Sequence, residues 1–215
     1  MMKRTRFVWA SLVAGAAFTA AGATAQNVVV VPPPAPAMMF DGHVSKLEYL
    51  DAKHFTFANG HGEVDVYAKV AEGRLCLGFV IPDDTVHMGD DMVVMLDTAN
   101  SRQETPDPKC LRAYVRRKIE NSRMHVGDGK AWVDQYGPWE YRANPYAAGW
   151  EMECRVPLSA IGVGGKTTLG FALRIWDDKP QKTYNWPAGS SEKRPATWGK
   201  LVLDTTKVLE IGEKP

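Results

Sequence analysis

The stretch VDVYAKVAEGRLCLGFVI, residues 64–81, decides the fold class of this chain. In its first half every second residue from Val64 to Val70 is small and apolar, and larger or charged side chains stand between them. Period two is typical of a strand with one buried face. Glu72-Gly73 then provides a turn, and residues 75–81 form a nearly continuous apolar run, typical of a central strand. The stretch therefore predicts two neighbouring antiparallel strands.

The same alternation continues along the chain. It recurs in residues 111–115, 150–158 and 169–175, while residues 92–96 form a second continuous apolar run. Gly127-Asp128-Gly129 has the composition of a hairpin tip. No stretch of the mature chain keeps a helical period for three turns, and the best helical candidate is a single turn at residues 157–162. We therefore expect an all-β protein: a single antiparallel β-sandwich of the jelly-roll or immunoglobulin-like kind.

The first 25 residues have the pattern of a cleaved signal peptide. Lys3, Arg4 and Arg6 precede an uncharged apolar run at residues 7–20, and Ala23-Thr24-Ala25 supplies the small residues of a cleavage site. The apolar run is shorter than the roughly 20 residues of a membrane span. We expect a secreted or periplasmic bacterial protein, with no membrane span once the signal peptide is cleaved after Ala25.

Domain boundaries follow from composition. Pro32-Pro33-Pro34-Ala35-Pro36 favours an extended spacer, so residues 26–37 are predicted to be a Pro-rich linker. The sandwich is expected over residues 38–205, and residues 206–215 are expected to form a C-terminal tail. No internal repeat or second proline block divides the sandwich.

Composition and charge exclude several classes of protein. The 215 residues are 45% hydrophobic and 24% charged, which excludes collagen, coiled coil and wholesale disorder. Lys and Arg total 26 against 25 Asp and Glu, so the net charge of +1 gives no indication of a nucleic-acid partner. Three cysteines allow at most one disulfide, and no CxxC motif is present.

The sequence contains no recognisable catalytic motif. The five histidines are dispersed, and Glu151 and Glu153, although they share a strand face, are expected to be solvated rather than a catalytic pair. We therefore do not expect an enzyme. Asp83-Asp84 and Asp90-Asp91 place acids in turns, where Asp83 and Asp90 could bind a structural calcium ion or could be solvated turn residues.

The aromatic residues are more informative. Trp176 shares its predicted strand face with Arg174, and Tyr114 shares its face with Arg112 and Arg116. A sugar ring has an apolar face of C–H bonds, which can pack against an aromatic ring. Its edge carries hydroxyl groups, which form hydrogen bonds with charged side chains. This pattern favours carbohydrate as the ligand. The alternative is that the rings close the ends of the sandwich under long loops.

Seven segments follow one another in a recognisable order: Phe40-Asp41-Gly42-His43, residues 64–70 with 73–79, Ile81-Pro82-Asp83-Asp84, residues 89–97, residues 151–162, residues 169–178, and residues 195–201. This order resembles that of family 9 carbohydrate-binding modules. The resemblance implies the DOMON-like β-sandwich superfamily, whose members bind sugars or haem without catalysing a reaction. It also implies structural calcium and an association with glycoside hydrolases, which could act as partner enzymes in carbohydrate catabolism.

The resemblance suggests particular binding residues. By position, Trp186 corresponds to one wall of the family's two-tryptophan sugar clamp, and Arg112 to a sugar-binding arginine. Asn100 and Asp84 are further carry-overs, and the strand faces add Trp176 and Tyr114. The predicted ligand is a poly- or oligosaccharide bound by an exported, non-catalytic protein.

Two alternatives come from other classes of protein. Haem-carrying relatives of this sandwich suggest a periplasmic electron-transfer protein with haem b, which needs two axial ligands. Candidate ligands are His87, Met88, Met92, Met124 and His125. The second alternative is a periplasmic structural protein whose aromatic face binds a partner protein.

Overall fold

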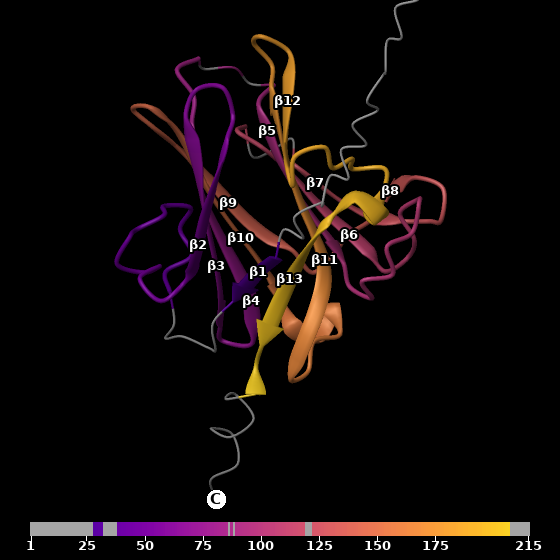
Figure 1. Ribbon diagram of the computed structural model, residues 1–215. Coiled ribbons are helices and arrows are strands. Elements are labelled where there is room, and N and C mark those ends of the chain that lie inside the picture. Colours follow the sequence, from indigo (N-terminus) through magenta and orange to yellow (C-terminus); the bar gives the residue numbers. More distant parts are fainter. Residues whose placement is uncertain (1–27, 32–37, 86, 88, 119–121, 207–215) are drawn as a thin grey trace, which may run out of the picture.

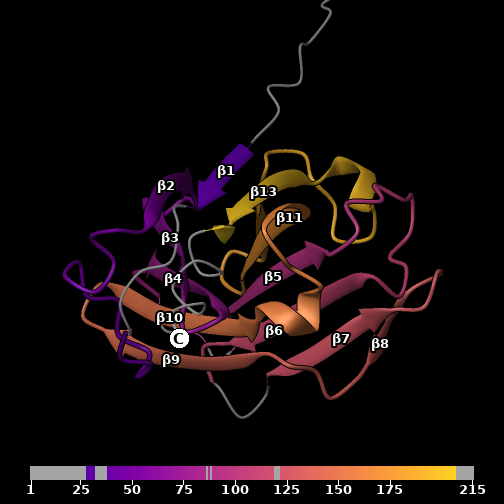
Figure 2. The same cartoon turned by 90° about the horizontal axis from the view of Figure 1, so that it is seen from below.

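The computed structural model describes residues 28–31, 38–85, 87, 89–118 and 122–206, and the predicted signal peptide lies outside them. Two β-sheets pack face to face (Figures 1 and 2). The all-β sandwich predicted from the sequence is therefore confirmed. Within the described residues there is no helix whose length and apolar character would let it cross a membrane.

The larger sheet has the strand order β1-β13-β11-β5-β6-β7-β8, with β12 paired to β11. Its strands are β1 (Val28–Val31), β5 (Asp91–Asp97), β6 (Cys110–Arg116), β7 (Arg123–Gly127), β8 (Trp132–Asp134), β11 (Lys166–Asp177), β12 (Lys182–Trp186) and β13 (Gly199–Asp204). The smaller sheet has the order β2-β3-β4-β10-β9. Its strands are β2 (Lys53–Ala58), β3 (Glu63–Ala71), β4 (Arg74–Pro82), β9 (Glu140–Tyr146) and β10 (Gly149–Pro157).

The stretch 64–81 forms the β3–β4 hairpin of the smaller sheet. Glu72 and Gly73 both have positive φ, as a tight turn requires, and β4 lies between β3 and β10 in the centre of the sheet. The predicted hairpin at residues 127–129 joins β7 to β8. The predicted helical turn is a single 3₁₀ turn, Leu158–Ile161, which ends at Gly162 in the left-handed conformation.

The core lies between the sheets and comes from alternate residues of both. Buried side chains include Val64, Leu77, Phe79, Met92, Leu96, Trp150, Met152, Phe171 and Leu173. Burying such side chains stabilises the fold by about 1.5–3 kcal/mol each. Cys76, Cys110 and Cys154 are buried and free, so no described pair forms a disulfide.

The folded region begins earlier than the sequence predicted. Val28–Val31 forms β1, which pairs in parallel with Lys200–Leu203 of β13 at the edge of the larger sheet. The predicted linker at residues 26–37 is therefore wrong for these four valines, because their backbone groups find partners on an open sheet edge. Residues 32–37, which contain the prolines, lie outside the described residues.

Residues 38–52 cover the outer face of the smaller sheet. There Glu153 is fully buried, and it accepts hydrogen bonds from the Tyr49 hydroxyl at 2.8 Å and from the backbone N–H groups of Asp41 and Gly42. The expectation that Glu153 is solvated is wrong, because period two does not reveal a covering segment. Gly78 lies under the Tyr49 ring, where an added Cβ would approach a ring carbon to 2.7 Å.

Candidate functional site

Strand register brings an aromatic and charged group of side chains together on the outer face of the larger sheet. Directly opposed residues point to the same face of a sheet. One row across the strands joins Trp176, Asp91 and Arg116. The next row joins Arg174, Val93, Tyr114 and Arg123, and a third joins Ala172, Met95, Arg112, His125 and Asp134. The face is therefore built from β11, β5, β6, β7 and β8.

This face contains a pocket of about 380 Å³. We call it the arginine pocket; its lining residues are Arg112, Tyr114 and Arg116 from β6 and Arg123 and His125 from β7. The alternation of these two strands, paired antiparallel, aims all five side chains to the same side. The pocket offers several N–H donors and an aromatic ring, and no acid lines it.

Asp91 anchors the neighbouring side chains. It is 2% exposed, and its carboxylate accepts the Tyr114 hydroxyl at 2.7 Å and a guanidinium N–H of Arg174. Burial raises the pKa of Asp91 to about 6, although Arg174 and Tyr114 oppose that shift. Arg116 donates to the same Tyr114 hydroxyl at 3.2 Å. The Tyr114 ring is therefore fixed in place between two arginines.

His125 is held as the neutral imidazole. Its Nδ1 accepts from Arg112 Nε at 3.3 Å, so the proton is on Nε2, which lies 2.9 Å from a carboxylate oxygen of Asp134. Burial, followed by the charge of Arg112, lowers the pKa of His125. At neutral pH the His125 side chain is therefore a polar but uncharged part of the pocket lining.

The β12–β13 connection forms one wall beside the pocket. Glu192 lies 3.5 Å from Arg112 Nη1 and 3.4 Å from Arg174 Nε, and its backbone carbonyl accepts from Trp132 Nε1 at 3.0 Å. The guanidinium of Arg112 lies over the Trp132 ring at 4.8 Å, and that ring stacks on Trp198. These contacts fix Arg112, so its donors are preorganised.

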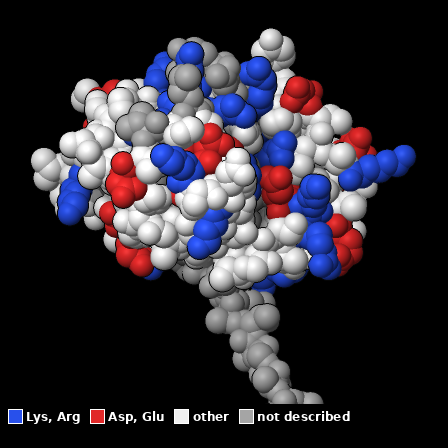
Figure 3. All heavy atoms as spheres, turned by 90° about the horizontal axis from the view of Figure 1, so that it is seen from above, with Lys and Arg blue, Asp and Glu red and all other residues white. Residues whose placement is uncertain are grey.

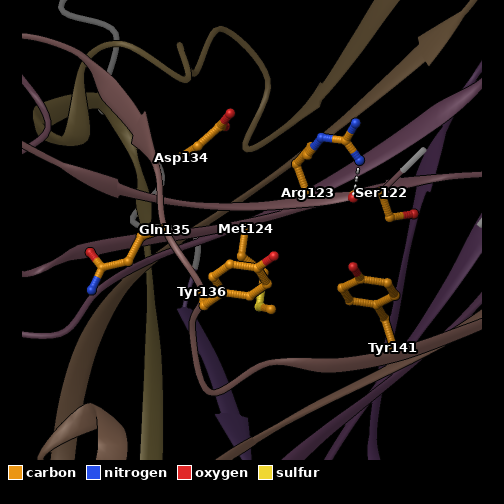
Figure 4. A pocket seen from close by; sticks show the side chains of 7 residues that line it. All are labelled: Ser122, Arg123, Met124, Asp134, Gln135, Tyr136 and Tyr141. Atoms are coloured by element: carbon orange, nitrogen blue, oxygen red, sulfur yellow. Dashed lines mark hydrogen bonds between the residues drawn. The ribbon is translucent and has the colours of Figure 1, made fainter. Parts of the chain in front are cut away.

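A second pocket of about 330 Å³ lies where β7, the β8–β9 connection and β9 meet (Figure 4). We call it the tyrosine pocket; it is lined by Ser122, Arg123, Met124, Asp134, Gln135, Tyr136 and Tyr141. In Figure 4 the ring of Tyr136 overlaps Met124, and the ring of Tyr141 lies to one side of them. Tyr136 is 97% exposed, which is unusual for a large aromatic side chain. Arg123 lines both pockets, so they are adjacent.

Three of the predicted binding residues share the outer face. Arg112 and Tyr114 line the arginine pocket, and Trp176 lies in the same row as Arg116. Trp186 does not share this surface. It pairs with the core residue Leu173, and its ring contacts Phe55 of one sheet and Phe171 of the other.

Trp186 lies in the core because it is one residue further along β12 than the residue that faces outward. Neighbouring residues of a strand point to opposite faces, so Asn185, opposite Arg174, takes the outer face beside the charged group. Trp186 fills the space between the sheets. The expectation that Trp186 and Arg112 form one surface is not met.

Asn100 and Asp84 lie away from both pockets. Asn100 is in the loop after β5 with a left-handed backbone, and its side-chain oxygen is buried without a described partner. Asp84 is 83% exposed and pairs with His61 at 2.7 Å. For the predicted calcium ligands, the Arg117 guanidinium lies 2.8 Å from Asp83 and 3.6 Å from Asp90. A cationic side chain therefore already stands between these two carboxylates.

His61 links two acids at this end of the sandwich. Its Nε2 is 2.7 Å from buried Asp177, and its Nδ1 is 2.7 Å from Asp84. The hydrogen bond to Asp177 is the main cause of the raised pKa of His61, which burial opposes. The folded state therefore binds a proton more tightly than the unfolded state does.

We expect His61 to make stability depend on pH. Its contribution is fully present below the ordinary histidine pKa of about 6.5 and is lost as pH rises through the folded pKa. Urea unfolding of the wild type and His61→Gln should show the largest difference in unfolding free energy near about pH 5.5 and the smallest near about pH 8.5. A difference that does not change with pH would contradict this assignment.

The residues considered as haem ligands are separated. Met92 is a core residue, His87 pairs with Asp178, and Met124 and His125, as strand neighbours, point to opposite faces. Met88 lies outside the described residues. The described candidates therefore do not converge on one cofactor.

The sequence analysis did not assign Arg123, His125, Tyr136 or Tyr141 to a sugar site, and it named His125 only as a candidate haem ligand. The signal for Arg123 and His125 was their alternation with Met124 in a strand that pairs with β6. Tyr136 and Tyr141 fall in a connection and an edge strand, where no periodicity marks one face. Only the path of the chain from the larger to the smaller sheet brings them together.

Comparison with solved structures identifies the fold. A family 9 carbohydrate-binding module from Caldicellulosiruptor kristjanssonii in complex with cellotriose matches with a TM-score of 0.63 and 16% identity, over 83% of this chain and 94% of that chain. The same organism's family 9 module in complex with glucose matches with a TM-score of 0.62 and 16% identity, over 83% and 96% of the two chains. The chain has the family 9 module fold.

This match confirms the resemblance found in the sequence as a similarity of fold. No protein-family model matches the chain, and no curated protein matches it significantly. At 16% identity the family 9 fold does not transfer the role of any single residue. The ligand must be argued from the side chains of the two pockets.

Proposed function

We propose that this protein is an exported, non-catalytic carbohydrate-binding protein whose glycan site spans the arginine and tyrosine pockets. The observation that carries the proposal is that Arg123 lines both pockets, so the exposed ring of Tyr136 and the partly buried ring of Tyr141 adjoin a group of hydrogen-bond donors. The C–H face of a sugar would contact Tyr136 and Tyr141, and sugar hydroxyls would accept from the arginines. The solved family 9 modules bound to cellotriose and glucose support the same ligand class.

The proposal includes export and a biological setting. The basic start, apolar run and Ala23-Thr24-Ala25 site support secretion or a periplasmic location. A partner glycoside hydrolase would supply the catalysis, because a binding protein of this kind holds the enzyme and its glycan substrate close to each other.

Isothermal titration against a panel of oligosaccharides tests the proposal. The panel contains cello-, xylo-, manno- and galacturono-oligosaccharides, and we expect saturable binding to at least one of them. Arg112→Ala should weaken that binding by about tenfold, because a charge-assisted hydrogen bond contributes about 1.5–3 kcal/mol. If the protein bound no oligosaccharide of the panel, the proposal would be contradicted.

We expect Tyr136→Ala to weaken binding without affecting folding. The 97% exposed ring contributes little to the core, whereas loss of ring contact with a sugar should reduce affinity by about 3- to 10-fold. The measurement is titration with the tightest ligand of the panel, alongside thermal unfolding. Leu47→Ala is the control, because Leu47 is an exposed apolar residue in the segment that covers the other sheet. Equal affinities of Tyr136→Ala and wild type would remove the tyrosine pocket from the site.

A further inference from the structure

Two of the guanidinium groups that line the arginine pocket have no carboxylate hydrogen-bonded to them in the described part of the chain. Arg174 is paired with Asp91, and Arg112 lies near Glu192. Arg116 and Arg123 have no carboxylate among their described hydrogen-bond partners. Asp91 and Asp178 attract Arg116 electrostatically without a hydrogen bond to it. Asp91 is already paired with Arg174, so two guanidinium groups face the pocket with no carboxylate bonded to them.

Arg116 is the more constrained of the two. Its Nη2 donates to the Tyr114 hydroxyl, while its Nε is buried without a described hydrogen-bond partner. A buried donor left unpaired destabilises the folded state, and an acceptor on a bound ligand would relieve that cost. Arg123 is exposed, and its Nη1 donates to the backbone carbonyl of Ser122 (Figure 4). Both guanidinium groups retain N–H donors for an incoming acceptor.

We propose that the ligand is an acidic glycan whose anionic group binds Arg116 and Arg123 in the arginine pocket. This inference rests on the proposed function and specifies its substrate class. A guanidinium fork matches the two oxygens of a carboxylate or sulfate, which would give both arginines the directly bonded anionic partner that neutral sugar hydroxyls do not provide. The neighbouring tyrosine pocket gives the uncharged face of the sugar ring an apolar contact.

The distribution of charge over the molecule favours a glycan over a nucleic acid. Figure 3 shows Lys and Arg interspersed with Asp and Glu on the face seen from above. The formal net charge of the whole chain is only +1. Tight binding to a nucleic-acid backbone uses an extended positive surface, whereas a local pair of arginines suits a single anionic group.

Titration with matched charged and neutral ligands tests the inference. The ligands are galacturonate, glucuronate and mannuronate oligosaccharides, each compared with its methyl ester, which has the same sugar ring without the charge. Sulfated galacto-oligosaccharides separate a sulfate preference from a carboxylate preference, and a single-stranded oligonucleotide tests the other class of polyanion. We expect one acidic oligosaccharide to bind at least about tenfold more tightly than its neutral form, with an advantage that shrinks between about 0.05 and about 0.5 M salt.

Variants connect the preference to the two arginines. Arg116→Gln and Arg123→Gln should each weaken binding of the charged form by about tenfold and leave the neutral form unchanged. Lys166→Gln, which removes the same charge at the exposed start of β11, should change neither. Loss of the preference in the exposed Arg123→Gln supports the assignment even where Arg116→Gln disturbs folding.

The outcomes separate this inference from the proposed function. Equal binding of the charged and neutral member of every pair overturns the acidic-glycan assignment and leaves glycan binding standing. Tighter binding of the oligonucleotide than of any glycan also overturns it. Binding of no glycan, charged or neutral, overturns both.

Discussion

Replacing Glu153 with alanine is expected to lower the unfolding free energy by about 3 kcal/mol. Its buried carboxylate accepts three hydrogen bonds from residues 41–49, and these bonds hold the covering segment on the smaller sheet. Removing it leaves the Tyr49 hydroxyl and two backbone N–H groups without this acceptor. Urea unfolding followed by tryptophan fluorescence measures the loss.

Two further variants separate the network from simple loss of volume. Glu153→Gln keeps the shape of the side chain and one acceptor oxygen, so we expect a smaller loss of about 1–2 kcal/mol. Glu151→Ala is the control on the same strand face, because Glu151 is only partly buried and contacts His43 and the Val44 N–H. A loss in Glu153→Ala no larger than that in Glu151→Ala would contradict the role given to Glu153.

Replacing Asp91 with alanine is expected to disrupt both stability and binding. Removing one partner of a buried ion pair costs about 3–5 kcal/mol, because the other charge stays buried. Here Arg174 would lose its carboxylate, and Tyr114 would lose the acceptor that fixes its ring in the arginine pocket. Urea unfolding and titration with the tightest glycan of the panel measure the two effects.

Asp91→Asn provides the comparison for binding. The amide keeps an acceptor for the Tyr114 hydroxyl, so we expect it to retain more glycan affinity than Asp91→Ala. Titration of both variants at a temperature where each is folded separates positioning from stability. If Asp91→Ala bound glycan as tightly as the wild type, Asp91 would have no positioning role.

The fold class could be predicted from the sequence because apolar residues at every second position mark the buried face of a strand. Val64 to Val70 alternate as a strand with one face in the core must, and the turn at Glu72-Gly73 follows from local backbone geometry. The burial of Glu153 and the pairing of β1 could not be predicted in this way. Their environments are created by residues 38–52 and by the open edge of β13, which are distant in sequence.

The candidate site was predicted in part for the same reason. Arg112 was predicted from its position in the family resemblance, and Tyr114 was added because residues two apart on one strand share a face. Trp186 was placed by its position before the last strand, and its strand pairing turns it into the core. Tyr136 could not be found, because neither alternation nor a motif distinguishes an exposed ring in a connection from one that closes the sandwich.

The central claim is that glycan binds on the outer face of the larger sheet and at its β7–β8 edge. Heteronuclear NMR of the tryptophan indole N–H groups during titration with the tightest oligosaccharide of the panel tests it most directly. The indole resonances of Trp132, beside Arg112, and of Trp176, in the row of Arg116, should shift as the site fills. The resonances of Trp150 and Trp186, which lie between the sheets, should not change. Shifts confined to Trp150 and Trp186, or no indole shift at saturation, would contradict the account.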